Sequence, residues 1–143
     1  MSRSGLTMKI SGDRELMRKL ETMDKNLRTR VSKAALRRAS VPVLQAQRTT
    51  SPDDTGTLRR ALARIVRSKN KVSYAIIGPR YPQAAHAHFT EGGTQERVQQ
   101  KTGRRVGRVV GVHWMRRAFD ASSSEAFSII KNVLRTFFEL RGK

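Results

Sequence analysis

Apolar residues in the first third of the chain recur at the spacing of an amphipathic helix. The pattern predicts a first helix that begins at Gly12 or Asp13, with Glu15 in its first turn, where a carboxylate suits the helix dipole. Residues 1–10 precede most of this pattern, and we expect them to form a flexible arm. The apolar positions of the first helix are Leu16, Leu20, Met23 and Leu27.

A second helical pattern covers about residues 26–48. On a helical wheel its apolar side chains share one half, which predicts one buried face and one basic face. Pro42 cannot donate a backbone hydrogen bond, and we expect a bend there rather than an end, because the apolar pattern continues beyond it. The apolar half holds Leu27, Val31, Ala34, Ala35, Leu36, Ala39, Val43 and Ala46; the basic side holds Arg30, Lys33, Arg37 and Arg48.

Alternation of apolar and polar residues replaces the helical period after residue 61. Leu62–Arg67 and Val72–Gly78 are predicted to be strands around the turn residues 68–71. Weaker patterns predict a third strand at Ala85–Thr90 and a fourth at Val106–Val112. Residues 92–106 are polar and contain glycine, so we expect a long, mobile, basic loop there.

The last part of the chain predicts an amphipathic helix. Ser122 and Glu125 have the spacing of a capping box, with Ser122 as the N-cap. A helix with so apolar a face must bury it, and the predicted sheet is the expected partner. The apolar half of the wheel holds Phe127, Ile130, Val133, Leu134, Phe137 and Phe138.

Composition narrows the class of protein. The 143 residues suit a single domain, residues 1–143, with one modest core. The chain has no cysteine, which removes disulfides and thiolate metal sites. No apolar run approaches the roughly 18 residues of a membrane span, and no signal-peptide core follows Met1. We therefore expect no contact with a membrane, and synthesis in the cytoplasm.

The charge is strongly positive along the chain. Thirty Lys and Arg residues against eleven Asp and Glu give a net charge of +19. The excess is +8 in residues 1–50, +8 in 51–111 and +3 in 112–143, so the charge is not confined to a tail. Such a field favours a polyanion as partner, either nucleic acid or an acidic protein surface.

Candidate chemistry is sparse. His86 and His88 alternate at strand spacing, with Glu91 and His113 farther on, but no paired helical spacing supports a zinc site. Lys101-Thr102 lacks the two glycines that a phosphate-binding P-loop needs before it. No nucleophile or acid/base pair stands out. We expect no enzyme, no catalytic residue, no cofactor and no metal.

Contact with a polyanion is the better-supported activity. The basic loop between the third and fourth predicted strands contains no aromatic residue, so base stacking there is not expected. Contact with DNA would be made to the DNA backbone. The residues predicted to contact a partner or DNA are Arg97, Lys101, Arg104, Arg105 and Arg108 in the loop, and Arg30, Lys33 and Arg37 on the second helix.

Three segments carry a further signal through their order. They are Ser-Pro-Asp-Asp-Thr-Gly-Thr-Leu-Arg-Arg at residues 51–60, His-Phe-Thr-Glu-Gly-Gly-Thr at 88–94, and Trp-Met-Arg-Arg-Ala-Phe-Asp at 114–120. Together they resemble the pattern of the small neck, or tail-completion, proteins of long-tailed bacteriophages, which join the head to the tail. The resemblance spans residues 9–140.

The resemblance implies an α+β fold with N-terminal helices, a small antiparallel sheet and a C-terminal helix packed on the sheet. The chain departs from the family pattern at Gly92, where an aromatic residue is usual, and in the long basic segment after Thr94. A structural role is implied for the residues that match: Asp54, Thr55, Gly56, Leu58, Arg59, Glu91, Gly93, Arg117 and Ala118.

The function implied is that of a structural protein at the virion neck, made in the cytoplasm of a bacterial host. It would join the head-side connector to the tail within a ring of identical copies. Its partners would be those copies, the neighbouring connector and tail-tube proteins, and the backbone of DNA in the neck. The alternative is a small basic nucleic-acid-binding protein that acts through phosphate contacts, a reading that leaves the three segments unexplained.

Overall fold

The computed structural model describes residues 14–52 and 55–142, and it has the predicted α+β class. Nine elements follow one another in the described residues: α1 (Arg14–Thr22), α2 (Lys25–Thr50), α3 (Thr57–Ala61), β1 (Leu62–Lys69), β2 (Val72–Pro79), α4 (Ala87–Gly92), β3 (Arg97–Val98), β4 (Arg105–Gly107) and α5 (Trp114–Arg141). The predicted N-terminal arm and the predicted helix start at Gly12 or Asp13 lie outside these residues.

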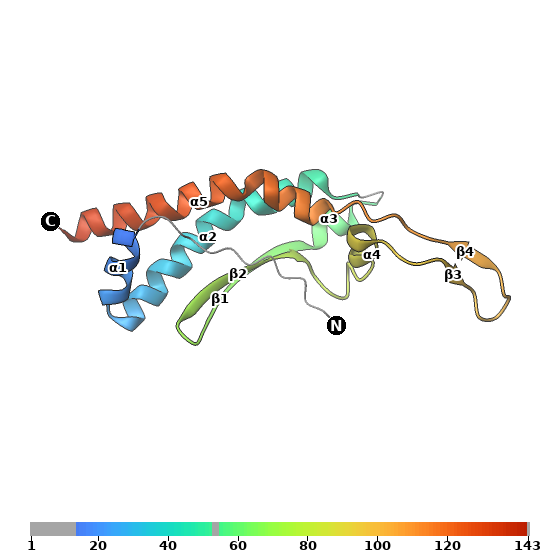
Figure 1. Ribbon diagram of the computed structural model, residues 1–143, viewed down its shortest axis with the longest axis horizontal. Helices are drawn as coiled ribbons and strands as arrows, with labels where there is room; N and C mark the ends of the chain where they lie inside the picture. Colours follow the sequence, from blue (N-terminus) through green and yellow to red (C-terminus); the bar gives the residue numbers. More distant parts are fainter. Residues whose placement is uncertain (1–13, 53–54, 143) are drawn as a thin grey trace.

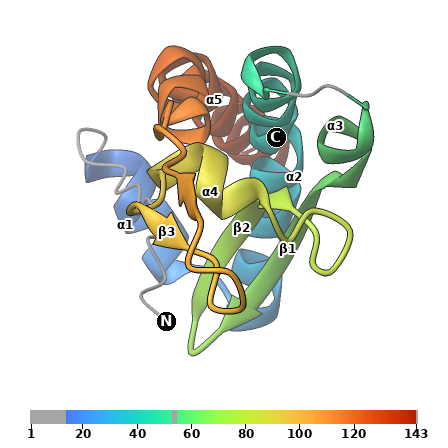
Figure 2. The same ribbon diagram turned by 90° about the vertical axis from the view of Figure 1, so that its right-hand side faces the viewer.

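Helix α2 is the central layer of the body. Helix α5 runs along one side of α2, and the β1–β2 hairpin lies against another side (Figures 1 and 2). The C-terminal helix was expected to pack chiefly on the sheet. This expectation is wrong, because α5 packs chiefly on α2. Both helices are long and apolar on one side, so they bury more surface against each other than either could against two strands.

The second predicted helix is confirmed with slightly wider bounds. Asp24 is its N-cap, and its carboxylate accepts hydrogen bonds from the backbone N–H of Asn26 (3.0 Å) and of Leu27 (3.3 Å). Pro42 lies inside α2, which continues to Thr50, so the proline does not end the helix. The apolar contacts beyond Pro42 explain its continuation, because they offset the lost hydrogen bond.

The first two predicted strands are confirmed. β1 and β2 pair antiparallel from Leu62 opposite Pro79 to Lys69 opposite Val72. Asn70 and Lys71 form the turn with φ values of 51° and 65°, which matches the twist of a two-residue hairpin turn. The face that carries Ala75 and Ile77 turns towards α2, and the opposite face remains exposed.

The core has two parts. The larger cluster joins α1, α2 and α5 around Val31, Ala35 and Ile130. The smaller cluster lies nearer α4 and contains two fully buried large side chains, Leu58 and Trp114. The smaller cluster is made by Leu44, Leu58, Ala61, Leu62, Ala84, Ala87 and Trp114.

The third predicted strand, Ala85–Thr90, is wrong, because residues 87–92 form α4. Ala84 and Ala87 are both buried, so the apolar period at this point is three rather than two. The N–H of Ala87 donates to the carbonyl of Ala84, as in a helical turn. Small side chains at that spacing let the turn lie close to Trp114.

The fourth predicted strand, Val106–Val112, is largely wrong. Only Arg105–Gly107 is extended and paired, as β4, and its partner is β3 within the segment expected to be a loop. The basic segment is therefore a small hairpin with an irregular register between Arg97 and Val98. Residues 108–113 form no strand; they return towards α5 and make separate backbone hydrogen bonds with Thr90, Glu91 and Thr94.

The predicted capping box is also wrong. Helix α5 begins at Trp114, so Ser122 lies in its third turn and is buried. The Ser122 hydroxyl donates to the carbonyl of Ala118 at 2.7 Å, which satisfies it inside the helix. The helix therefore includes the Trp-Met-Arg-Arg-Ala-Phe-Asp segment, which gives α5 its first two turns.

Candidate functional site

A basic hairpin projects from one end of the body (Figure 1). We call residues 94–112 the arm; it contains β3 and β4, and every residue from Gln95 to Val110 is exposed. An extended segment with so few contacts to the body presents most of its side chains to a partner.

Five predicted contact residues lie on the arm. Arg105 is 3.8 Å from the carboxylate of Glu96, and both side chains are exposed. The guanidinium of Arg97 lies over the ring of Phe89, 5.3 Å from its centroid. The structure brings these five together on one hairpin: Arg97, Lys101, Arg104, Arg105 and Arg108.

The other predicted contact residues lie elsewhere. Arg30, Lys33 and Arg37 belong to the half of α2 nearer α1, whereas the arm leaves the opposite end of the body (Figure 1). Arg64 of β1 donates to the carbonyl of Arg37 and, at 3.0 Å, to the hydroxyl of Ser40. The two basic groups therefore do not form one continuous surface.

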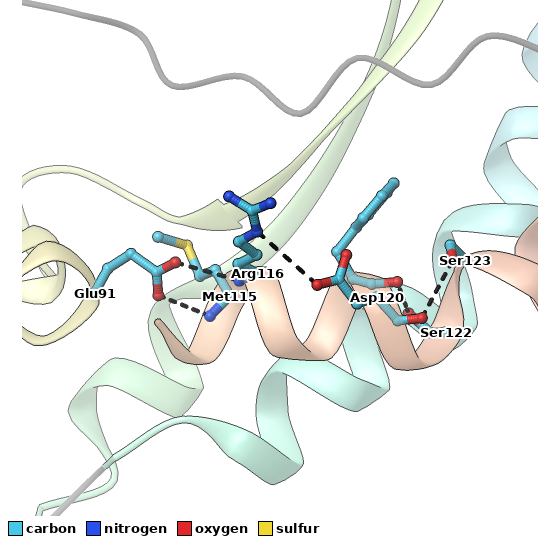
Figure 3. Close-up of polar contacts among 7 residues, drawn as sticks. Glu91, Met115, Arg116, Asp120, Ser122 and Ser123 are labelled. Carbon is cyan, nitrogen blue, oxygen red and sulfur yellow. Dashed lines mark hydrogen bonds and ion pairs between the residues drawn. The ribbon is translucent and has the colours of Figure 1, made fainter. Parts of the chain in front are cut away.

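The arm is anchored at its base by Glu91, which caps helix α5 (Figure 3). Its carboxylate accepts from the backbone N–H of Met115 at 2.8 Å and of Arg116 at 3.2 Å. Its carbonyl also accepts from the N–H of His113 at 3.1 Å. A negative side chain at a helix N-terminus satisfies free N–H groups and suits the helix dipole, so Glu91 fixes where α5 starts.

Gly93 and Gly111 bring the two chain segments at the base of the arm close together. A Cβ on Gly111 would lie 2.5 Å from the carbonyl carbon of Gly92 and 2.6 Å from the nitrogen of Gly93. Next to this contact, the N–H of Thr94 donates to the carbonyl of Val109 at 2.9 Å, and the N–H of Val109 donates to the hydroxyl of Thr94 at 2.9 Å. Only residues without a side chain permit this approach.

Trp114 joins the arm base to the body. Its side chain is 0% exposed, and its indole N–H donates to the hydroxyl of Thr90 at 3.2 Å. It packs in the smaller core cluster with Leu58, which is 1% exposed. Leu58, Glu91 and Trp114 come from the three segments noted in the sequence, so those segments meet at one joint.

The remaining pattern residues are placed as follows. Asp54 lies outside the described residues. Gly56 precedes α3 with φ of 75°, and the backbone carbonyl of Thr55 accepts from Arg60 at 3.2 Å. Ala118 is fully buried in α5. Arg59 and Arg117 are exposed, and Gly93 lies in the arm base.

The histidines do not gather into a metal site. No group of three or more His, Asp or Glu side chains within residues 14–52 and 55–142 is arranged to hold a metal ion. His86 precedes α4, and His113 precedes α5 with φ of 49°. The sequence pattern predicted His86 and His88 on one strand, but the structure has helix α4 in place of that strand.

An exposed apolar face on the sheet is a feature that the sequence reasoning missed. Ile65 and Ile76 are cross-strand partners on the side of the hairpin away from α2, and Ile76 is 52% exposed. Val72 and Tyr74 extend the same face. We call these four residues the outer sheet face. Alternation signals two faces, but only the position of α2 decides which one is left uncovered.

Comparison with known protein families shows which family the chain belongs to. A family model described as "Bacteriophage HK97-gp10, putative tail-component" matches residues 14–93, more than half of the sequence. The chain belongs to this HK97-gp10-like family. Membership agrees with the resemblance drawn from the sequence and supports a structural role in the phage particle.

The family match ends at Gly93, where the arm leaves the body, so the arm and α5 lie beyond it. No curated protein and no solved structure matches the chain. Within the described residues, none of the helices is both long enough and apolar enough to cross a membrane.

Proposed function

We propose that this protein completes the joint between the head and the tail of a phage or phage-like particle. It would act as a non-enzymatic structural subunit at the neck, in a ring of identical copies between the head-side connector and the tail tube. Membership of a phage tail-component family is the observation that carries the proposal. The neck position comes from the three segments that resemble tail-completion proteins.

The arm and its base fit such a role. A joining subunit needs a surface that reaches beyond its own body to the next component. The arm extends outward, while Glu91, Gly111 and Trp114 hold its base to the smaller core. Repetition of this contact around a ring would turn individually weak contacts into a lasting joint.

The outer sheet face supports the proposed contact between copies. Apolar side chains gathered on an exposed face mark a site of association in many soluble proteins. Ile65 and Ile76 meet there across the two strands, and a hollow beside them is lined in part by Gly78 and Tyr81. We assign this face to a second copy of the chain, because a ring requires two different surfaces on each subunit.

Interruption of the gene tests the joining role. Particles made without the protein are expected to accumulate as filled heads beside separate, complete tails in electron micrographs. Supply of the wild-type protein from a plasmid should restore joined particles, which controls for effects on neighbouring genes. Normal, intact particles from the interrupted gene would contradict the proposed function.

A further inference from the structure

The tip of the arm has an unusual chemistry for a protein surface. Residues 99–105 read Gln-Gln-Lys-Thr-Gly-Arg-Arg, all are exposed, and none has an apolar side chain. The turn is held by its own hydrogen bonds, from the N–H of Gln99 to the carbonyl of Arg104 (2.9 Å) and from the N–H of Gly103 to the carbonyl of Gln99 (2.8 Å). The Thr102 hydroxyl also donates to the side-chain oxygen of Gln99 at 2.8 Å, so within the tip it is the charged ends of Lys101 and Arg104 that are left for an external partner.

The positive charge of the arm is largely uncompensated. Glu96 is the sole acidic residue between Thr94 and Val112, against five basic residues. Glu96 approaches Arg105 alone, at 3.8 Å. In the part of the chain that the structure describes, the charged ends of Lys101, Arg104 and Arg108 have no protein partner. Such a surface attracts a polyanion.

The residue types favour nucleic acid over a folded acidic protein. Protein interfaces draw most of their affinity from buried Trp, Tyr and Arg anchors; the arm has neither Trp nor Tyr, and its exposed apolar residues are small valines such as Val98, Val106 and Val110. Gln, Thr, Lys and Arg are the side chains that commonly donate to phosphate oxygens. The arm also lacks the aromatic residues that stack on single-stranded bases, so a duplex is the better fit.

We propose that the arm binds the phosphate backbone of double-stranded DNA through Lys101, Arg104 and Arg108, with Arg97 and Arg105 beside them. The two strands of the arm form a β-ribbon, which fits the major groove of B-DNA, about 12 Å wide. Binding would be independent of sequence, because phosphates carry no base information. This inference goes beyond the joining role and does not require the neck position.

Salt dependence gives the measurable signature. Each phosphate contact contributes about −0.9 to the slope of log affinity against log salt, so five contacts give a slope of about −4.5. Removal of three arm charges should reduce the magnitude of that slope by about 2.7. The loss should come from the arm and not from the net charge of the whole chain.

The experiment compares two triple variants in a fluorescence anisotropy titration of a short duplex over a salt series. The arm variant is Lys101→Gln, Arg104→Gln, Arg108→Gln; the control is Arg14→Gln, Arg18→Gln, Lys25→Gln, at exposed positions near α1 and with the same net charge. Circular dichroism should show that both remain folded. A third variant, Arg104→Lys with Arg108→Lys, keeps the charge and should keep the wild-type slope.

The expected result is a shallower slope and weaker binding for the arm variant, with the control close to wild type. Equal slopes for the arm and control variants would overturn the proposal, because binding would then follow net charge alone. Failure of the wild-type protein to bind duplex DNA at low salt would also overturn it. Neither outcome bears on the joining role, which the gene interruption tests separately.

Discussion

Replacement of Trp114 by alanine is expected to lower the free energy of unfolding by about 3–5 kcal/mol, the usual cost of a buried Trp→Ala change. The side chain is fully buried, and its indole N–H donates a hydrogen bond to the hydroxyl of Thr90. Folded domains are stable by only about 5–15 kcal/mol. The variant should therefore unfold at a temperature lower by on the order of 10 °C or more.

Thermal unfolding followed by circular dichroism measures this effect without relying on tryptophan fluorescence, which the variant loses because the chain has one Trp. Tyr81→Ala is a matched control, since Tyr81 is an aromatic residue that is 84% exposed. The control should change the stability by no more than about 0.5 kcal/mol. A Trp114→Ala protein that melts with the control would show that the smaller core does not hold the body together.

The Gly111→Ala variant is expected to open the base of the arm. The new methyl group would meet backbone atoms of Gly92 and Gly93 at 2.5 and 2.6 Å, and backbone cannot rotate away as a side chain can. Overpacking of this kind costs about 1–3 kcal/mol, occasionally more. The hydrogen bonds between Thr94 and Val109 should weaken, because they lie next to the contact.

Amide hydrogen exchange is the direct measurement for this variant. The N–H groups of Thr94 and Val109 should exchange faster in Gly111→Ala than in the wild type. Gly92→Ala is the matched control, because a Cβ at Gly92 would meet nothing within 4 Å. Unchanged protection at Thr94 and Val109 in Gly111→Ala would contradict the proposed close packing of the arm base.

Local patterns predicted the elements whose cause is local. The second helix follows from its apolar spacing, and the β1–β2 hairpin follows from alternation around a polar turn at Asn70 and Lys71. The buried set of α2 differs from its predicted apolar half: Ala34 is exposed, whereas Leu44 and Gln47 are buried. The helix contacts α5 on one side and the sheet on another, and a single apolar stripe cannot show two partners.

The start of α5 could not be predicted because its cap is distant in sequence. Ser122 and Glu125 have a capping-box spacing, which predicts a helix start from neighbours alone. The actual cap comes from Glu91, more than twenty residues before Met115, once α4 has brought it there. The position of the arm could not be predicted for the same reason. Its charge was evident from the sequence, whereas the way it projects from the body depends on the packing of Gly111 and Trp114 at its base.

The most direct test of the joining role is the position of the protein in intact particles. Particles that carry an affinity tag on this chain are purified away from free protein and treated with a gold-conjugated antibody against the tag. In electron micrographs the gold label should lie at the junction of head and tail. Label at that single position in most particles is the result that we predict. Label spread along the tail, or none on intact particles, would contradict the proposed role at the neck.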